Sequence, residues 1–476
     1  MQKDLLEQFQ PMFYPRGIAV VGASKDERKM GHAWVRGLIR AGFRGKVYAV
    51  NPNEDEVLGL KTYPDVKSTP GPVDLAIVCI PRRFALSLLD DCAAKGVKAV
   101  HFFTGGFRET GRPEDRALED EVVEKARQTG IRVIGPNCVG IYNPEARIPW
   151  GPSDLLGEPG NVGLVSQSGG HAGKVAEIGL VGGIRFSKVV SYGNGADLDG
   201  ADFLEYLGVD PRTEVIGAYM EGATDGRKLI NVISRVTRTK PVVVWKAGRT
   251  RPGAEAASSH TGSMAASADV WSAALRQSGA IEVAGIEELT DTLLLFQQVK
   301  RLAGNRLGVV CGLTDGGGGE SVLSADACAS HGVEVPRFLP ETREKLAAIF
   351  GEVGSVLRNP LDVSQGYGDV DKLRRGMELV YAEPQVDILA VYENADILGR
   401  FLSQDVRDGM NALFIEFSRR HKKPVIAVLP PGSAEESRLN VKKSLLGAGM
   451  PVFDSMDRAA QAIANVYRYS ARGGKY

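Results

Sequence analysis

Several features that mark particular classes of protein are missing from this chain of 476 residues. Its five cysteines form no C-x-x-C pair, so the sequence indicates neither a disulfide framework nor a zinc site, and we expect no metal site. No apolar run approaches the roughly 20 residues of a membrane span, and residues 1–10 lack the apolar core of a signal peptide. We therefore expect a soluble, reduced, cytoplasmic protein with no membrane partner.

An excess of charge of one sign is also missing. The chain has 58 lysines plus arginines and 58 aspartates plus glutamates, which gives a formal net charge of zero. Proteins that bind nucleic acid or an anionic membrane usually carry a basic excess that neutralises phosphate groups. Nucleic acid is therefore not an expected partner.

Glycine is abundant, and its placement points to the fold class. Many of the 57 glycines, about 12% of the chain against an ordinary ~7%, follow short apolar runs. Apolar runs at 18–21, 47–50 and 75–80 alternate with amphipathic stretches of helical length, such as 84–95 and 118–129. Apolar strands separated by helices predict a parallel sheet covered on both faces. The fold class is therefore α/β, and the length suggests three domains.

The chain after residue 150 contains an internal repeat. Residues 210–227 align with residues 383–400, so that Pro211 meets Pro384 and Glu393 falls within one position of Glu221. The repeat predicts two related α/β domains behind a first one. We place the three domains at 1–150, 156–303 and 305–476.

The two copies differ in a loop of small and polar residues. In the first copy Gly279 follows Gly248 by 31 positions, whereas in the second Gly449 follows Gly432 by 17. The additional residues carry His260, and a neutral imidazole is both a base and a nucleophile near pH 7. A solvated loop histidine is the alternative. The insertion favours a catalytic role, because loops change without disturbing the core.

A second candidate site is V-S-Q-S-G-G at 165–170, which follows an apolar strand and opens a helix. Free backbone N–H groups and the helix dipole favour an anion there, whereas simple capping of the helix is the alternative. The motif has neither the G-K-[ST] of a Walker loop nor the spacing of a nucleophile elbow. The candidate phosphate ligands are Ser166, Ser168, Gly169 and Gly170.

A third candidate is Glu221, at the end of the strand expected over 215–220. Active-site residues gather at the carboxyl ends of strands in α/β sheets, and a carboxylate there can orient an imidazole. The alternative is a carboxylate that faces water; its counterpart Glu393 shows that this position alone need not mean catalysis.

Turns in the first domain give further candidates. The segment V-V-G-A-S at 20–24 is similar to a nucleotide-binding turn, yet the G-x-G-x-x-G fingerprint is absent. Asn51 stands where a protein that binds NAD has an acidic residue for the ribose, so a nicotinamide-dependent dehydrogenase is not expected. In the turn at 134–140, Asn137 offers a donor and an acceptor, and Cys138 is interpreted as an unreactive thiol because it has no basic neighbour.

Five motifs, taken in order, make the chain resemble the α subunit of the nucleoside-diphosphate-forming acyl-CoA synthetases, which are relatives of the succinyl-CoA synthetase α subunit. The motifs are V-V-G-A-S (20–24), I-G-P-N-C-V-G-I-Y-N-P (134–144), V-S-Q-S-G (165–169), Y-M-E-G (219–222) and S-S-H-T-G-S (258–263). The resemblance implies a Rossmann-like CoA-binding domain followed by two flavodoxin-like domains. It also implies contacts with CoA from Gly22, Ala23, Ser24, Pro52, Pro81, Thr104, Gly105, Gly106 and Asn137.

The same resemblance implies a reaction. Acyl-CoA and phosphate give an acyl phosphate and CoA, His260 takes the phosphoryl group, and ADP accepts it to form ATP. Glu221 would hold the imidazole, and the helix start at 168–170 would cradle the phosphate. A mobile loop of glycine, alanine and serine suits a histidine that carries a phosphoryl group between two sites.

The chain departs from the family pattern in lacking an ATP-grasp module. ADP or ATP and Mg²⁺ are therefore expected on a separate ATP-grasp β subunit, within a hetero-oligomer of the α₂β₂ type. The alternative is a non-catalytic paralogue that binds CoA or acyl-CoA in a regulatory role; intact His260 and Glu221 argue against it.

The helix after Ser168 also departs from the pattern, because it reads G-G-H-A-G-K. One hypothesis is that Gly170, Ala172 and Gly173 widen an acyl pocket, in which His171 or Lys174 meets a polar acid. Lys174 facing solvent is the simpler alternative.

Overall fold

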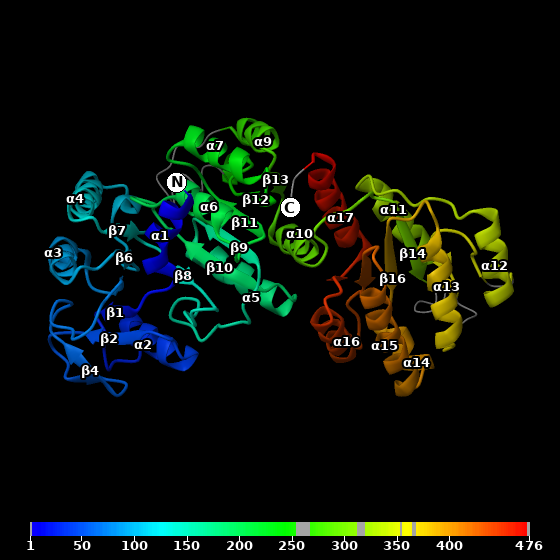
Figure 1. The fold of residues 1–476 in the computed structure, drawn as a ribbon, viewed down its shortest axis with the longest axis horizontal. Coiled ribbons are helices and arrows are strands. Elements are labelled where there is room, and N and C mark those ends of the chain that lie inside the picture. The colour runs from blue at the N-terminus through cyan, green and yellow to red at the C-terminus, as the bar shows by residue number, and fades with distance from the viewer. Residues whose placement is uncertain (1, 254–266, 312–318, 353–354, 364–367, 474–476) are drawn as a thin grey trace. The chain divides into compact units, whose positions relative to one another are not determined.

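The computed structural model of the protein describes residues 2–253, 267–311, 319–352, 355–363 and 368–473 (Figure 1). Three largely parallel sheets flanked by helices make up these parts, which confirms the predicted α/β class. The chain divides into two compact units, one reaching Ile286 and the other spanning Glu287–Gly474. The first unit holds two of the sheets and the second unit holds the third. The domain boundaries inferred from the repeat stay a prediction.

The first sheet has seven strands in the order β3-β4-β2-β1-β5-β6-β7. Its central strand β1 is buried at every position and pairs in parallel with β2 and β5. The strands are β1 (Gly17–Val21), β2 (Lys46–Val50), β3 (Glu56–Val57), β4 (Leu60–Tyr63), β5 (Leu75–Val78), β6 (Ala99–Phe102) and β7 (Arg132–Ile134). The helices in this part of the chain are α1 (Gln2–Phe13), α2 (Met30–Ala41), η1 (Arg82–Phe84), α3 (Ala85–Lys95), η2 (Arg108–Thr110) and α4 (Pro113–Thr129).

Local sequence explains where these helices stop. Helices α2, α3 and α4 are followed by Gly42, Gly96 and Gly130, with φ angles of 66°, 79° and 72°. Residues with side chains avoid this left-handed conformation, so glycine ends each helix and turns the chain back toward the sheet.

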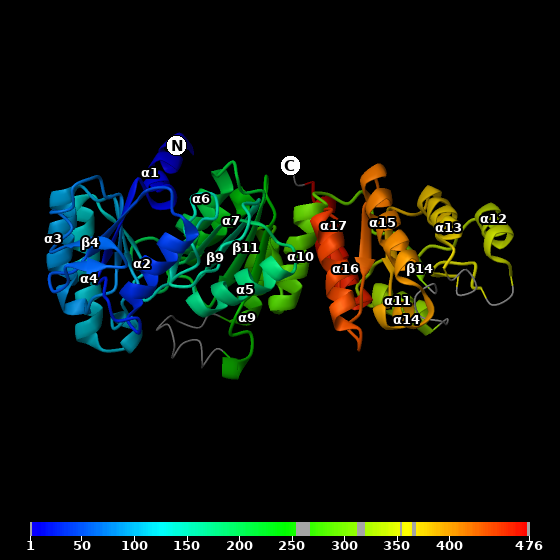
Figure 2. The same ribbon diagram turned by 90° about the horizontal axis from the view of Figure 1, so that it is seen from below.

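The second sheet has six strands in the order β13-β12-β11-β9-β10-β8. Its strands are β8 (Gly140–Tyr142), β9 (Val162–Ser166), β10 (Phe186–Ser191), β11 (Val215–Met220), β12 (Val242–Lys246) and β13 (Ile281–Val283). Its helices are α5 (Gly169–Val181), α6 (Gly200–Val209), α7 (Gly226–Val236) and α9 (Ala268–Gln277). Helices α5 and α6 lie on opposite sides of β9 and β11 (Figure 2).

Strand β8 differs from the expectation. It lies within the segment that the sequence assigns to the first domain, yet it pairs antiparallel with β10, with Tyr142 opposite Val189. The second sheet therefore takes its edge strand from the chain that leaves the first sheet, and the loops of both sheets meet within one unit.

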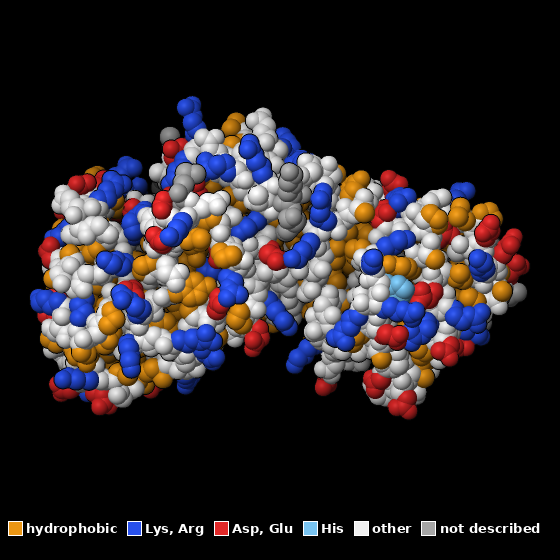
Figure 3. Space-filling view, in the orientation of Figure 1, with side chains coloured by type: hydrophobic (Ala, Val, Ile, Leu, Met, Phe, Trp, Pro, Cys, Tyr) orange, Lys and Arg blue, Asp and Glu red, His pale blue; other side chains and the backbone are white. Residues whose placement is uncertain are grey.

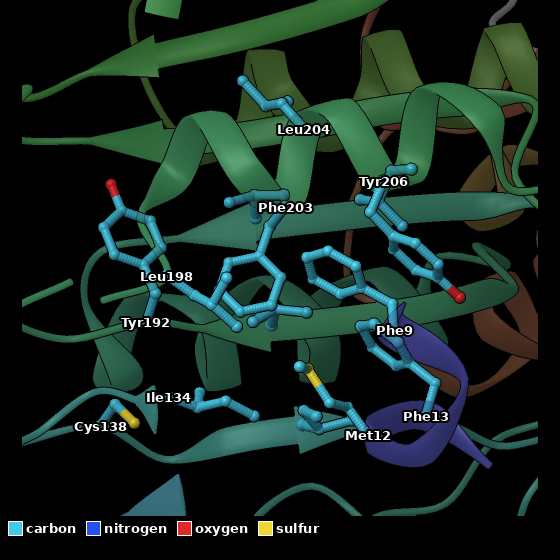
Figure 4. Packing of buried hydrophobic residues seen from close by; sticks show 14 of the residues in the cluster. Phe9, Met12, Phe13, Ile134, Cys138, Tyr192, Leu198, Phe203, Leu204 and Tyr206 are labelled. Carbon is cyan, nitrogen blue, oxygen red and sulfur yellow. The ribbon is translucent and has the colours of Figure 1, made fainter. Parts of the chain in front are cut away.

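The N-terminal helix α1 also packs against the second sheet's layer (Figure 4). The rings of Phe9 and Phe13 each stack on Tyr206 of α6, with centroids 4.7 Å apart. Beside them, Lys188 forms a fully buried ion pair with Asp210 at 2.7 Å. Stacked aromatic pairs add to the free energy of burial, and a buried charge needs such a partner. These contacts join the start of the chain to the helix layer of the second sheet.

The sheet of the second unit has five parallel strands in the order β15-β14-β16-β17-β18. Read from its other edge, this order repeats the order β13-β12-β11-β9-β10 of the second sheet, as the internal repeat predicts. The strands are β14 (Leu307–Cys311), β15 (Leu361–Asp362), β16 (Ile388–Tyr392), β17 (Val425–Val428) and β18 (Val452–Phe453). The helices are α10 (Ile286–Gln298), α11 (Gly319–Ser330), α12 (Pro340–Phe350), α13 (Val370–Ala382), α14 (Ala395–Phe401), α15 (Gln404–Arg420), α16 (Glu435–Gly447) and α17 (Met456–Ala471).

Helix α10 is tied to α17 inside this second unit. Arg458 donates to Asp291 at 2.6 Å and 2.9 Å, and Asn465 donates to Thr292 at 3.0 Å. The repeat placed this helix with the preceding domain, but its polar contacts are with the chain's last helix.

The surface agrees with the composition. Figure 3 shows basic and acidic side chains interspersed over the visible face of each unit, as expected from their equal numbers. Within the described ranges, none of the helices combines the length and the apolarity that crossing a membrane requires.

Candidate functional site

A cavity of about 340 Å³ lies at the carboxyl edge of the second sheet and gathers several of the predicted residues. It opens where β9 and β11, neighbours in the sheet, lead into loops, the usual position of a ligand site in this topology. Loops from the first sheet contribute the other wall. The lining residues are Phe103, Asn137, Cys138, Val139, Gln167, Ser168, Gly169, Gly170, Gly193, Asn194 and Glu221.

The start of helix α5 forms one side of this cavity. Ser168 caps the helix and accepts a hydrogen bond from the backbone N–H of His171 at 3.4 Å. A side chain at Gly169 would collide with Val139, with a β-carbon only 2.5 Å from a methyl carbon, so glycine lets the two loops touch. Gly170 has open space beside it. The first N–H groups of the helix therefore face an accessible volume, which suits an anion.

Ser166 has a different position from the other three predicted phosphate ligands. It is completely buried, and its hydroxyl donates to the carbonyl oxygen of Ser168 at 2.7 Å. Ser166 thus stabilises the turn through this hydrogen bond.

Glu221 faces the same cavity and is held by several groups. Its backbone N–H and that of Gly222 both donate to Gln167 Oε1, at 3.0 Å and 3.1 Å. The hydroxyl of Tyr219 donates to Glu221 Oε1 at 3.1 Å, and the Lys246 ammonium donates to the Glu221 carbonyl oxygen at 2.9 Å. The carboxylate is therefore fixed at the strand end, as a group that orients a partner must be.

The environment sets the protonation of two of these groups. Burial, followed by the neighbouring Glu221 carboxylate, raises the pKa of Tyr219, so the phenol keeps its proton and remains a donor. Burial lowers the pKa of Lys246, whose ammonium also lies 5.2 Å from the centre of the Trp271 ring. Gln167, Tyr219 and Lys246 were not predicted from the sequence, although the first two lie within the motifs V-S-Q-S-G and Y-M-E-G.

His171 lies beside the cavity and contacts Ser168 and Tyr219. Its Nδ1 is 3.1 Å from Ser168 Oγ, and its ring stacks on Tyr219 with centroids 4.4 Å apart and planes 12° apart. Lys174, one turn further, is exposed. The placement of His171 therefore differs from the hypothesis that it meets the acid.

The hypothesis that Ala172 and Gly173 widen an acyl pocket is wrong. Both are buried on the core side of α5, and a β-carbon at Gly173 would lie 2.7 Å from Trp150 Nε1. Glycine at 173 admits the indole ring, whereas Gly170 lies on the helix face that lines the cavity. At 100° per residue the two positions lie only about 60° apart around the helix, so it is the indole packed against Gly173, and the open space beside Gly170, that distinguish them.

The opposite wall comes from the loops after β6 and β7. Asn137 has a left-handed backbone with a φ of 56°, which asparagine tolerates better than most residues. A β-carbon at Gly193 would lie 2.3 Å from the carbonyl oxygen of Pro136, so glycine allows the two loops to pack closely. Cys138 is buried, and burial raises the pKa of its thiol, in agreement with the interpretation that it is unreactive.

A second, larger cavity of about 970 Å³ lies at the carboxyl edge of the first sheet. It is lined by the predicted residues Gly22, Ser24, Pro52 and Pro81, and by three cationic residues that were not predicted from the sequence, Lys29, Lys67 and Arg83. Helix α2 begins directly after Lys29, whose side chain makes no capping hydrogen bond. Uncapped N–H groups with a lysine beside them suit a phosphate group.

The remaining residues predicted to contact CoA lie around these two cavities. Ala23 is buried, and its carbonyl oxygen accepts a hydrogen bond from Asn51 at 2.6 Å, so Asn51 shapes the turn. Thr104 donates to the carbonyl oxygen of Ile80 at 2.7 Å. In the described parts of the chain, Thr104, Gly105 and Gly106 line neither cavity; they form the loop between them.

His260 lies outside the described residues, so its position is not part of this geometry. The described chain leaves β12 at Lys246, next to Glu221, runs to Gly253 and resumes at Ser267. Among the residues that the structure describes, no group of three or more His, Cys, Asp or Glu side chains is placed to hold a metal ion.

Comparison with known families agrees with this geometry. Residues 16–144 match the model of a CoA binding domain, and residues 159–296 match the model of the succinyl-CoA ligase like flavodoxin domain. The larger cavity lies within the first matched segment, whereas residues of both segments line the smaller one. The fold and the cavities together define the class of CoA ligases.

Similarity to individual proteins narrows the class. The chain is 37% identical over 463 residues to the α subunit of ADP-forming acetate–CoA ligase II from Pyrococcus furiosus, covering 97% of this chain and 98% of that one. It is 39% identical over 464 residues to ADP-forming acetate–CoA ligase I from Archaeoglobus fulgidus, covering 98% of this chain but only 64% of that longer protein. Acetyl-coenzyme A synthetase 1 from Ca. Korarchaeum cryptofilum, solved with phosphate and ADP, superimposes with a TM-score of 0.85 at 34% identity, covering 98% and 97% of the two chains.

The chain belongs to the family of ADP-forming acyl-CoA ligases, in which it matches α subunits over 97–98% of its length. The resemblance inferred from the five sequence motifs is thereby confirmed.

Proposed function

We propose that this chain is the catalytic α subunit of an ADP-forming acyl-CoA ligase. The complete reaction interconverts acyl-CoA, ADP and phosphate with a carboxylic acid, CoA and ATP. The observation that carries the proposal is the cavity in which the start of α5, the fixed Glu221 and the Asn137 turn meet. An anion at that helix start would lie beside a carboxylate placed to orient an imidazole.

Two covalent steps belong to this chain. A phosphate oxygen attacks the thioester carbonyl carbon, the carbon–sulfur bond breaks, and CoA leaves as a thiolate that takes up a proton. A ring nitrogen of His260 then attacks the phosphorus of the acyl phosphate, the bond from phosphorus to the acyl oxygen breaks, and the carboxylate leaves. Splitting the exchange in this way replaces one difficult transfer with two easier ones.

The residues of the cavity have distinct roles in these steps. Ser168, Gly169 and Gly170 hold phosphate through a hydroxyl and backbone N–H groups, aided by a helix dipole that is worth ~0.3–2 kcal/mol. Glu221 accepts the hydrogen of the His260 nitrogen that does not react, and stabilises the charged ring. Ser166 stabilises the turn by its hydrogen bond to the carbonyl oxygen of Ser168.

The larger cavity of the first sheet is the proposed CoA site. Gly22, Ala23 and Ser24 face its phosphates at the start of α2, with Pro52 and Pro81 on the rim of the cavity. Thr104, Gly105, Gly106 and Asn137 lie on the route toward the smaller cavity, where the thioester reacts. This route links the two sites within one unit of the chain.

A separate ATP-grasp β subunit is proposed to bind ADP or ATP with Mg²⁺, in a cytoplasmic α₂β₂ complex. The full-length match to an α subunit, together with the 64% coverage of a longer relative, supports a division of the reaction between two chains. The phosphoryl group on His260 then passes to ADP on the partner.

The test is phosphate labelling of the complex reconstituted with its ATP-grasp partner. Radioactive phosphate and acetyl-CoA should label His260 and be chased into ATP by ADP; acetyl-CoA is tried first because the relatives are named for acetate. His260→Asn should abolish both, while His331→Asn in the second unit should abolish neither. Binding of acetyl-CoA without any labelling across a panel of acyl-CoA thioesters would instead identify the non-catalytic paralogue.

A further inference from the structure

We propose that His171 is a positioning residue for the phosphate site: it aims the hydroxyl hydrogen of Ser168 into the cavity. This inference rests on the proposed function and adds to it a residue of the G-G-H-A-G-K helix. Nothing in the reaction itself requires a histidine at this position.

The imidazole of His171 is held on several sides. Helix α5 carries it, Tyr219 of β11 stacks on its face, and Trp245 of β12 meets it edge-on at 5.2 Å with planes 83° apart. Its Nδ1 lies 3.1 Å from Ser168 Oγ. An aliphatic side chain would fill the same space between Tyr219 and Trp245, so packing alone does not account for a nitrogen aimed at a serine hydroxyl.

The hydrogen-bond capacity of Ser168 shows what that nitrogen does. A serine hydroxyl has one hydrogen and two lone pairs. One lone pair accepts the backbone N–H of His171 at 3.4 Å. When Nδ1 carries a hydrogen, it occupies the second lone pair, and the hydroxyl hydrogen is left to point at another acceptor. Because Ser168 lines the cavity, that acceptor is an oxygen of the bound phosphate.

The opposite arrangement would work against phosphate. If Nδ1 carried no hydrogen, it would accept the hydroxyl hydrogen of Ser168, and the lone pairs of the serine would then face the anion. The presence of phosphate therefore selects the state in which Nδ1 donates, since only that state offers the anion a hydrogen bond.

The same ring also supports the other half of the site. Tyr219, on which His171 stacks, donates its hydroxyl to Glu221 Oε1 at 3.1 Å. One imidazole thus contacts the phosphate-binding serine directly and the tyrosine that orients the carboxylate. Replacing it should affect phosphate more than CoA, whose proposed cavity lies at the first sheet.

The experiment uses the reconstituted complex and three variants. His171→Leu keeps the bulk and removes the donor, His171→Asn retains an amide donor near the position of Nδ1, and Lys174→Ala is the matched control one turn along the same helix. His171→Leu should raise the KM for phosphate by about tenfold, because it removes about one hydrogen bond to a charged group. The KM for CoA should not change. His171→Asn should recover most of the loss, and Lys174→Ala should show none.

A double-mutant cycle with Ser168→Ala separates positioning from structure. If His171 acts through Ser168, His171→Leu has no further effect on the phosphate KM once the hydroxyl is gone. An equal increase in the Ser168→Ala background overturns the proposal, and so does a His171→Asn enzyme that folds with an unchanged melting temperature yet loses as much as His171→Leu.

Failure of the proposed function gives a different result. In that case the wild-type complex shows no labelling at all, whatever residue stands at 171. Titration of the same variants with inorganic phosphate, followed by ³¹P NMR, then measures the contribution of His171 without any turnover: a weaker affinity in His171→Leu alone supports the positioning role, and equal affinities contradict it.

Discussion

The side-chain amide of Asn194 donates a hydrogen bond of 2.8 Å to Glu119 Oε2, and so connects the loop after β10 with helix α4 of the first sheet. The same amide donates to Glu109 at 2.6 Å. Glu119 is completely buried and also contacts Arg108. Because Asn194 lines the phosphate cavity as well, this contact joins the geometry of the proposed site to the packing of the two sheets.

Asn194→Ala should destabilise the first unit. It leaves the buried Glu119 with fewer donors, and an unsatisfied buried polar group costs about 1–3 kcal/mol of the free energy of unfolding. Chemical denaturation of the purified chain measures the loss. Asn411→Ala, which removes an amide that donates to Ser444 at 3.2 Å near the surface, is the control and should change the free energy of unfolding by less.

Glu119 should also make stability depend on pH. Burial raises the pKa of its carboxyl above the ordinary 4.5, with Asn194 and Arg108 acting in the opposite direction. The folded state then holds this proton more tightly than the unfolded state does, so stability is lost as the pH rises from about 4.5 through the raised pKa. Glu119→Gln, which carries no ionisable proton, should show a flatter profile over that interval. Parallel profiles for the two proteins would contradict this assignment.

Tyr219→Phe should slow the labelling of His260 without changing the affinity for CoA. The variant keeps the stacking with His171 but removes the hydrogen bond to Glu221 Oε1, and one such bond to a charged acceptor is worth ~1.5–3 kcal/mol. A decrease of about tenfold or more in the rate of labelling is therefore expected, measured by rapid quenching. Tyr392→Phe, at the equivalent strand position of the second unit, is the matched control and should leave the rate unchanged.

The repeated topology could be predicted from the sequence, whereas the residues that line the cavity could be predicted only in part. Apolar strands and the alignment of residues 210–227 with residues 383–400 predicted two related sheets, and the strand orders agree. The family resemblance implied one site for Ser168 and Glu221, and in the structure these residues follow neighbouring parallel strands.

The remaining parts depend on contacts between segments far apart in the sequence. Strand β8 pairs with β10 across more than forty residues, and Asn194 reaches Glu119 from another sheet. No local pattern encodes such pairings, since hydrophobic periodicity reports only that a strand or helix face is buried. Gly173 was misread for the same reason: whether a glycine faces a pocket or an indole depends on what packs against the helix.

Gly173→Ala should therefore destabilise the protein, although alanine is the better helix former. Its β-carbon would lie 2.7 Å from Trp150 Nε1, which is too close, so the buried indole must move. Overpacking of this kind typically costs about 1–3 kcal/mol. Gly170→Ala, three residues earlier, is the matched comparison: its nearest neighbour would be 4.0 Å away, so helix propensity should leave stability unchanged or slightly increased. Equal unfolding midpoints for the two variants would show that Trp150 accommodates the methyl group.

Lys29→Ala should weaken the binding of CoA to the cavity of the first sheet. Lys29 lines this cavity directly before helix α2, where the N–H groups have no side-chain cap, so an ammonium and the helix start can act on one phosphate group. Loss of one exposed charge-assisted contact should raise the Kd by about three- to tenfold and reduce its dependence on salt, as measured by calorimetry at two ionic strengths. Lys46→Ala is the matched control: it removes an exposed lysine from the start of β2, at the opposite edge of the same sheet, and so changes the net charge by the same amount. If both variants bind CoA equally weakly, the effect is one of overall charge and the assignment of Lys29 to the phosphates is wrong; a loss confined to Lys29→Ala places a phosphate of CoA at the start of α2.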